Sequence, residues 1–236
     1  RRQCADSIFA FLRGQQADII CLQEFRISDI NKVRSYLQKQ LKDYKAEFYL
    51  FPMSNGSAFG NVTLSRLPVK GKGKIKFEES ANLALYTDYK VERRSFRVYN
   101  CHFQSYGISF NGLVRAFAER DEQAFAETSR KVKRSILLRP KQVNQVFDHV
   151  ESCQIESFVC GDFNDNPMSY TYQRLIRGRK DSFVEAGKGV GATFSLLWPM
   201  LRIDYVLFPD RCKGMSHRID RIPFSDHYPV VSEIAI

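Results

Sequence analysis

The sequence predicts an α/β fold in one domain, built on a mixed β-sheet or on two packed sheets. Short apolar runs typical of strands alternate along the chain with stretches of helical periodicity. Between residues 59 and 103 the strand-like runs follow one another without a helical stretch, so part of the sheet is expected to be a meander. The 236 residues show no internal repeat and no sharp composition shift, which favours a single domain over residues 1–236.

The N-terminal part is expected to contain two helices with a buried strand between them. Residues 4–12 carry apolar side chains at helical spacing, and Gly14 ends this helix. Residues 19–22 form a short apolar run, typical of a buried strand, and Glu24 follows directly after it. Residues 30–41 have the periodicity of a second amphipathic helix.

The rest of the chain alternates between strands and one long charged segment. Lysines recur at every second position from Lys70 to Lys76, which places their ammonium groups on one face of an expected edge strand. Within the segment 113–150, residues 115–130 are very polar and are expected to be a mobile connection, whereas the remainder has helical periodicity. The expected strands are 59–65, 81–89, 96–103, 157–160, 203–208 and 230–236.

The net charge of +10 favours an anionic partner, such as nucleic acid, a phosphorylated small molecule or an anionic membrane surface. Scattered surface charge kept for solubility is the alternative. No apolar run reaches the roughly 18 residues of a membrane span, and no signal peptide opens the chain. Because the chain begins at Arg1 without an initiator Met, we expect a fragment whose upstream part could have carried a targeting or membrane segment.

Four segments share one design, a short apolar strand that ends in or contains carboxylate, Asn or His side chains. Each residue alone has an ordinary structural explanation, such as a solvated strand end or a tight turn. Together they are harder to dismiss, because charged groups at buried strand ends cost free energy unless they are paired or bind a metal. The residues are Glu24, Asp162, Asn164, Asp165, Asp204, Asp226 and His227.

This set of side chains indicates a hard-cation site with a hydrolytic pair beside it. Glu24 and Asp226 are suitable Mg²⁺ ligands, since Mg²⁺ prefers oxygen donors and keeps several waters. Asp162 could orient or deprotonate the attacking water, and Asn164 could donate to a phosphoryl oxygen as charge builds there. His227 needs a partner that fixes its tautomer, and Asp204 can supply it.

The motifs "LQE", "GDFND", "RIDYVLF" and "SDHYPV", in this order, resemble those of the endonuclease/exonuclease/phosphatase superfamily, from about Ala17 to Ile236. The resemblance implies a four-layered α/β sandwich of two facing mixed sheets flanked by helices. It also implies Mg²⁺ or Mn²⁺ at Glu24, a water-positioning Asp162, a transition-state-stabilising Asn164 and an Asp204–His227 pair.

Two further segments fit the same superfamily. "FGNVTLSRLPV" is similar to its strand ending in Ser-Arg and Pro, and "RVYNCHFQS" is similar to its histidine strand. The second would make His102 a ligand of the substrate phosphate, with a core histidine as the alternative. One departure stands out: the family's first strand, which carries an Asn of the metal site, is missing here, so one sheet is expected to lack a strand.

Three functions stay open. The first, which we favour, is a Mg²⁺-dependent phosphodiesterase acting on nucleic acid, and the second acts on a lipid headgroup or a phosphorylated small molecule. The third is an inactive phosphate-binding module, against which the intact site residues argue. No stable protein partner is implied, and a monomer is expected. Trp198 could stack on a base or merely pack in a loop, and Tyr106 and Phe110 could line the site. Basic segments that could follow a phosphate backbone are 70–76, 93–97, 130–141 and 174–180.

Overall fold

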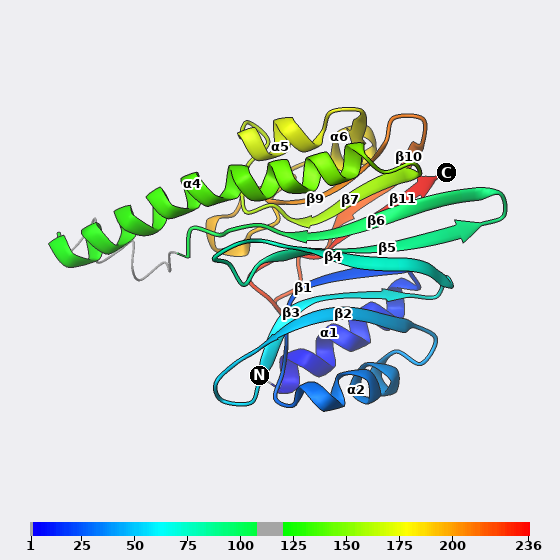
Figure 1. Ribbon diagram of the computed structural model, residues 1–236, viewed down its shortest axis with the longest axis horizontal. Helices are drawn as coiled ribbons and strands as arrows, with labels where there is room; N and C mark the ends of the chain where they lie inside the picture. Colours follow the sequence, from blue (N-terminus) through cyan, green and yellow to red (C-terminus); the bar gives the residue numbers. More distant parts are fainter. Residues whose placement is uncertain (1, 108–119) are drawn as a thin grey trace.

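The computed structural model describes residues 2–107 and 120–236 and arranges them in four layers. Figure 1 shows two sheets lying face to face, with the N-terminal helices on the outer face of one and helices from the second half of the chain on the outer face of the other. This is the predicted α/β sandwich of two facing sheets flanked by helices, and the fold class is confirmed. Both sheets were expected to be mixed, whereas only the larger one contains a parallel pair.

The smaller of the two facing sheets is antiparallel, with the strand order β1-β3-β2. Its strands are β1 (Ile19–Ile27), β2 (Lys45–Pro52) and β3 (Ala58–Ser65). The helices on this side are α1 (Arg2–Gln15), the short 3-10 helix η1 (Ile30–Lys32) and α2 (Val33–Gln40). A β-bulge between Leu22 and Phe25 interrupts the pairing of β1 with β3, and Glu24 lies inside it.

The larger sheet has six strands in the order β4-β5-β6-β7-β9-β8. Only β6 and β7 are parallel among these neighbours, so the sheet is mixed as predicted. The strands are β4 (Val69–Lys76), β5 (Leu83–Val91), β6 (Arg94–His102), β7 (Glu156–Asp162), β8 (Arg179–Asp181) and β9 (Asp204–Pro209).

The remaining elements are one hairpin and the helices of the upper layer. Strands β10 (Lys213–Ile219) and β11 (Val230–Ala235) form a two-stranded antiparallel sheet. Helix α4 (Glu122–Glu151) is 30 residues long, and in Figure 1 its first half projects beyond the body of the molecule. The shorter elements are α5 (Tyr170–Leu175), α6 (Ser182–Ala186) and the 3-10 helix η3 (Ser195–Leu197).

Three apolar clusters fill the three interfaces between the four layers. One joins the six-stranded sheet to α4 and α5, one joins the three-stranded sheet to α1 and α2, and one lies between the two sheets. Each buried apolar side chain stabilises the fold by roughly 1.5–3 kcal/mol before the entropy of ordering it is subtracted. Representative members are Tyr99, Val146 and Leu207 for the first cluster, Phe9, Leu37 and Leu64 for the second, and Tyr89, Phe96 and Phe208 for the third.

Buried amide side chains also join the two sheets. Asn100, fully buried on β6, accepts a hydrogen bond at 2.7 Å from Gln23 Nε2 of β1 and donates to the Val62 carbonyl of β3 at 3.0 Å. Asn61 of β3 donates in return to the Asn100 carbonyl at 2.9 Å. Because a buried amide is stable only when its hydrogen bonds are satisfied, these contacts fix how one sheet sits on the other.

Several expectations need correction against this fold. The segment 115–130 is not a mobile connection where it is described, because α4 begins at Glu122, with Asp121 accepting a hydrogen bond from the Ala124 N–H as its cap. Helix α1 runs one residue past Gly14, and β1 extends well beyond Leu22. Strand β2 was not anticipated, nor were α5, α6, β8 and β10.

Two other expectations have different outcomes. Strand β4 is an edge strand with its lysines exposed on one face, as predicted. That one sheet lacks a first strand stays a prediction, although β1 and β11 each pair with a single strand in the described part of the chain. Across residues 2–107 and 120–236, no helix has the length and apolar character needed to cross a membrane.

Candidate active site

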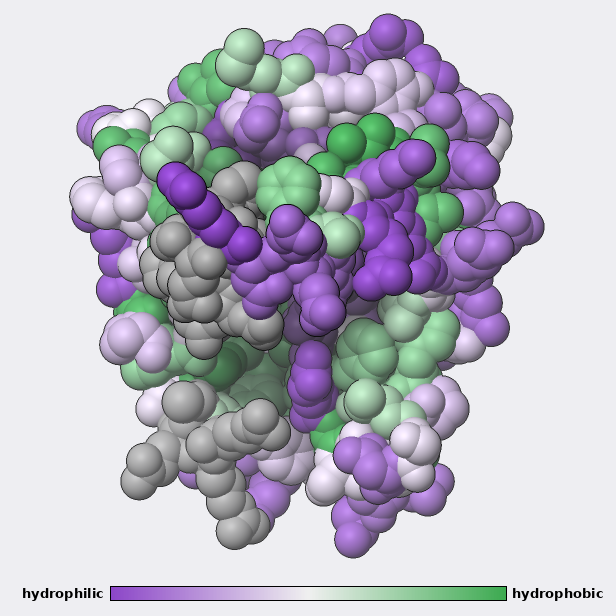
Figure 2. Space-filling view, turned by 90° about the vertical axis from the view of Figure 1, so that its left-hand side faces the viewer, coloured by the Kyte–Doolittle hydropathy of each residue, from purple (hydrophilic) through white to green (hydrophobic). Residues whose placement is uncertain are grey.

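Three of the predicted site residues lie side by side on neighbouring strands of the large sheet. His102 ends β6 and is in register with Asp162, which ends the parallel strand β7. Asp162 is in turn in register with Asp204, the first residue of β9. Both β6 and β7 run from right to left in Figure 1, so the site lies at the left end of the molecule. Figure 2 faces this end and shows it hollowed near its middle, beside hydrophilic residues.

His227 joins this row through Asp204. The two side chains meet at 2.9 Å between Nδ1 and Oδ2, although His227 lies in the loop that precedes β11. A backbone bridge to Phe194, whose ring packs edge-on against the imidazole, holds His227 in place. Burial acts to lower the pKa of His227, but the hydrogen bond and charge of Asp204 outweigh it and raise this pKa to about 9. The imidazole therefore carries a proton readily at neutral pH.

Asp162 is almost completely buried, with 7% of its surface exposed. Asn164 donates to it twice, from its backbone N–H at 2.7 Å and from its side-chain amide at 2.9 Å. Burial, reinforced by the charge of Asp204, raises the pKa of Asp162 to about 8. A carboxyl group in such a position holds and releases a proton near neutral pH, which suits a general acid or base.

The backbone conformation around Asp162 explains why Gly161 and Asn164 occupy their positions in the "GDFND" motif. Gly161 has φ of +128°, and a Cβ there would collide with the Cys101 carbonyl of the adjacent strand. Asn164 adopts the left-handed region at φ of 52°, which Asn tolerates better than most residues. Its side chain also donates to the Phe103 carbonyl at 3.0 Å, so Asn164 links the ends of β6 and β7.

Glu24 reaches the same site from the other sheet. It lies within the β1 bulge and has a positive φ of 51°, a conformation that costs free energy and re-aims the side chain. Its carboxylate lies 3.9 Å from His102 Nε2, which is itself 3.7 Å from Asp162. Burial lowers the pKa of His102, against the charge of Glu24, so this imidazole tends to be neutral.

Asp226 is the predicted ligand that the structure connects least to the others. It is exposed, and its contacts within the described residues run to Ser195 and Ser225 rather than to Glu24. The tightest group of possible metal-binding atoms there is instead Asp162, Asp204 and His227, whose ligand atoms lie within 4.8 Å of one another. The hydrogen bond between Asp204 and His227 already occupies one atom of each, which leaves fewer atoms of this group free for a cation.

Sequence reasoning missed a buried arginine that supports the site. Arg139 of α4, 3% exposed, forms an ion pair with Asp165 at 3.0 Å and donates from Nε to the Gln104 carbonyl at 2.7 Å. One turn further, Gln142 accepts from the Gln104 N–H at 2.8 Å. These contacts hold the segments that follow His102 and Asn164. A signal was present, because polar residues three apart on the apolar side of a helix are unusual.

The other suggested residues have different surroundings. Tyr106 is partly exposed, lines a surface pocket and carries the Arg139 guanidinium over its ring at 4.4 Å. Phe110 lies outside the described residues. Trp198 does not pack in a core: it is 44% exposed, in a loop bonded to the segment that bears His227.

The sequence profile of the Endonuclease/Exonuclease/phosphatase family matches residues 1–227, and the chain belongs to that family. Its members are phosphoesterases that include nucleases and phosphatases. A search of curated proteins finds no sequence relative.

Solved structures share the fold at low sequence identity. An endonuclease/exonuclease/phosphatase from Beutenbergia cavernae has a TM-score of 0.73 at 20% identity, over 98% of this chain and 66% of that one. The human Nocturnin catalytic domain with bound sulfate anion has a TM-score of 0.71 at 17% identity, over 100% and 86%. The mannosyl-6-phosphatase Bt3783 of Bacteroides thetaiotaomicron has a TM-score of 0.65 at 14% identity, over 99% and 91%.

Proposed function

We propose that this protein is a Mg²⁺-dependent hydrolase of phosphodiester bonds. The observation that carries the proposal is the register of His102, Asp162 and Asp204 across three neighbouring strands, with His227 bonded to Asp204 at 2.9 Å. Such a row presents an acid, a base and hydrogen-bond donors to one phosphoryl group. Family membership supports phosphoester chemistry, and the site residues assigned here are part of the proposal.

The side chains around the site fit a hard divalent cation. Glu24 and Asp226 offer carboxylate oxygens, which Mg²⁺ or Mn²⁺ prefers, and we propose these two as the ligands. When bound, the cation would neutralise charge on the phosphoryl oxygens and on the leaving group. The strained φ of Glu24 supports this assignment, because a strained residue at a bulge is commonly one whose side chain must be aimed.

The chain's own residues then divide the proton and charge chemistry. Asp162 orients the attacking water and is placed to take its proton, which its raised pKa favours. His227, kept protonated by Asp204, donates to a phosphoryl oxygen as negative charge builds there. The reverse assignment, with His227 as base, uses the same geometry. Neutral His102 and the Asn164 amide add hydrogen bonds to the phosphate.

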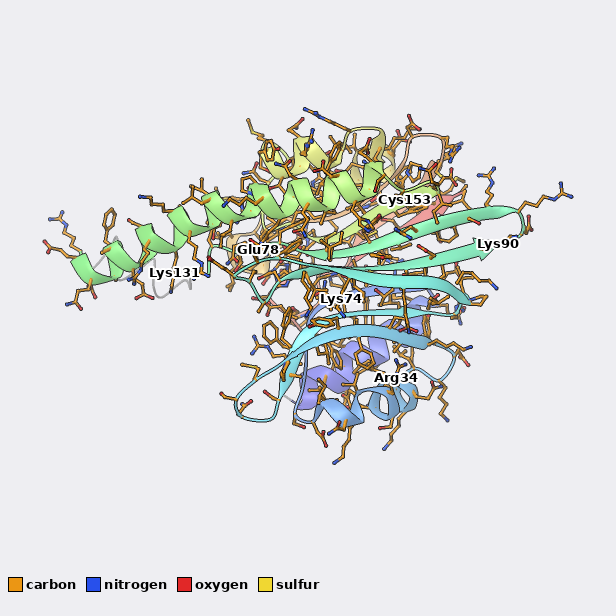
Figure 3. All side chains as sticks on the ribbon, in the orientation of Figure 1. Arg34, Lys74, Glu78, Lys90, Lys131 and Cys153 are labelled. Carbon is orange, nitrogen blue, oxygen red and sulfur yellow. The ribbon has the colours of Figure 1, made fainter. Side chains whose placement is uncertain are left out.

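Nucleic acid is the first substrate that we propose, on the strength of the +10 charge. Exposed cations on the projecting half of α4 support it, among them Arg130 and Lys133. Lys131, labelled in Figure 3 on the same half of the helix, is already paired with Glu127 at 2.7 Å. Elsewhere the predicted basic track is largely engaged within the protein. Lys72 pairs with Glu47, Lys74 lies 4.2 Å over the Tyr49 ring, and Arg97 forms two hydrogen bonds with Asp88.

A lipid headgroup phosphoester is the second candidate, and one observation favours it. The loop beside His227 exposes four large apolar side chains, which a polyanionic backbone does not require. A phosphate-binding module without turnover is the candidate of another class, and it would give saturation without product.

Cleavage of a plasmid and of oligonucleotides with Mg²⁺ or with EDTA tests the proposal, with a soluble phosphodiester and short-chain phospholipids assayed in parallel. Hydrolysis that needs the metal and disappears in His227→Ala is expected. The variant also controls for contaminating nucleases. Absence of product from every phosphoester, in a well-folded protein that saturates with ligand, would replace the enzyme by the binding module.

A further inference from the structure

The loop of residues 195–200, which we call the apolar loop, exposes an unusual number of large apolar side chains. Leu196 is 58% exposed, Leu197 37%, Trp198 44% and Met200 79%. Single exposed apolar residues are common on protein surfaces. Four within five consecutive residues concentrate apolar surface in one loop, as is typical of an interaction site.

Backbone hydrogen bonds shape the apolar loop. The Met200 N–H donates to Leu197 at 2.8 Å, and the Thr193 N–H donates to Leu201 at 2.9 Å across the base of the loop. The loop is also tied to the catalytic segment, because the Ser195 N–H donates to the Asp226 carbonyl at 2.8 Å. A surface that contacts the apolar loop therefore comes close to His227, the neighbour of Asp226.

The composition of the loop favours hydrocarbon over a nucleobase. Leu196, Leu197 and Met200 gain free energy by leaving water for an apolar phase, while a base offers them little beyond its edge. Trp198 is the side chain that stacks on bases, but the Arg221 guanidinium already lies 4.5 Å from its ring centre. A Trp beside leucines with a cation at its ring is the combination found where proteins enter the headgroup region of a bilayer.

The positive charge near the apolar loop favours a bilayer with anionic headgroups. Arg221 is exposed and has no ion pair among residues 2–107 and 120–236, so its charge is free to meet an anion. Lys188, in the segment that leads to the loop, is exposed and equally unpaired within the same residues. With a net charge of +10 for the chain, attraction to anionic headgroups adds to the apolar insertion.

We propose that the apolar loop docks this protein on an anionic lipid bilayer and brings a phosphoester at the headgroup level to the site of Asp162, Asn164 and His227. The proposal rests on the proposed phosphoesterase function for its substrate, whereas docking itself needs no turnover. It assigns Leu196, Leu197, Trp198 and Met200 to the membrane and Arg221 to the headgroups.

The chain contains a built-in reporter, because Trp198 is its only tryptophan. Vesicles of phosphatidylcholine, and of phosphatidylcholine with an equal amount of phosphatidylglycerol, are added in EDTA so that binding is measured without hydrolysis. We expect Trp198 emission to move to shorter wavelength and the protein to sediment with the anionic vesicles. Met200→Ser should weaken this binding at least about tenfold, as expected from the loss of one buried apolar side chain.

The control is Met215→Ser on β10, which removes another exposed methionine, at 57% against 79% for Met200, and should bind like the wild type. Failure to bind anionic vesicles, in a protein that hydrolyses a soluble phosphodiester with Mg²⁺, would overturn docking and leave the proposed function intact. Vesicle binding without hydrolysis of any phosphoester would overturn the proposed function and leave docking intact. Docking is also overturned if an oligonucleotide quenches Trp198 and displaces the vesicles, or if the emission shift depends on protein concentration alone, as for a second copy of the chain.

Discussion

His227 and Asp204 are bonded at 2.9 Å between imidazole Nδ1 and carboxylate Oδ2, from two segments that are 23 residues apart. With Nδ1 donating to Asp204, the other ring nitrogen is the one available to a substrate. Asp204 is 14% exposed at its side chain, so the pair is partly screened from water. The hydrogen bond therefore fixes both the tautomer and the direction of the imidazole.

Asp204→Asn tests this relationship. An amide can keep the ring in place but cannot stabilise a protonated imidazole, so we expect turnover to fall by about 10²–10⁴-fold. Steady-state kinetics on the best substrate, with KM nearly unchanged, measures the effect. Asp220→Asn is the control, since that carboxylate pairs with Arg218 at 3.1 Å in an exposed position. Wild-type turnover in Asp204→Asn would remove the pair from the mechanism.

Asp162→Asn should lose turnover by a similar factor and yet make the metal-free protein more stable above neutral pH. The pKa of Asp162 is raised to about 8, mainly by burial, from 3.8. Between these values the unfolded chain has lost the proton that the folded chain keeps, so stability falls as pH rises through this window. The variant loses a hydrogen bond from Asn164 worth about 1 kcal/mol, but a buried carboxylate costs more.

Thermal melting in EDTA from pH 5 to pH 9 measures that effect. The melting temperature of the wild type should fall relative to the variant as pH rises. Parallel curves for the two proteins, or an active variant, would contradict the assignment of Asp162 as a buried reacting group.

Arg139→Ala should destabilise the fold and slow the reaction together. It leaves the Asp165 carboxylate and the Gln104 carbonyl without their buried partner, a loss of about 3–5 kcal/mol for a broken buried ion pair. Urea unfolding gives the free energy. The comparison is Arg134→Ala on the same helix, whose exposed side chain bonds the Glu79 carbonyl. This variant should change stability by less than about 1 kcal/mol.

Acid should weaken the fold through His217. This side chain lies 2.8 Å from Ser182 Oγ and 3.0 Å from Ser232 Oγ, and burial chiefly lowers its pKa to about 4. Below the unfolded value of 6.5 the unfolded chain takes up a proton that the folded chain refuses until about pH 4, so stability is lost as pH falls through that window. Melting curves of His217→Gln should show a smaller loss between pH 7 and pH 4.5, and an equal loss would assign the acid effect to other groups.

The grouping of site residues at strand ends could be predicted from the sequence because the strands that carry them are neighbours in the sheet. Once β6, β7 and β9 pair, residues at their ends must meet, as His102, Asp162 and Asp204 do. Contacts between side chains of different layers could not be predicted from the sequence. The approach of Glu24 to His102 depends on a bulge, and that of Arg139 to Asp165 depends on where a helix packs.

Two errors in the secondary structure have physical causes. The first half of α4 projects from the body, so it has little core to face and shows no clear apolar stripe (Figure 1). Strand β2 was missed because it is the outer strand of its sheet and most of its residues are only partly buried, which blurs the alternation that identifies strands.

The buried amides between the sheets have a consequence for how activity reports on structure. Glu24 belongs to one sheet and His102 to the other, so the proposed active site is complete only while the two sheets stay packed together. The hydrogen bond between Gln23 and Asn100 holds the two sheets in register close to this site. Gln23 is next to Glu24, and Asn100 lies two residues before His102. Loss of this hydrogen bond would shift Glu24 relative to His102 before the protein unfolds. A fall in turnover would therefore report separation of the two sheets earlier than thermal melting does.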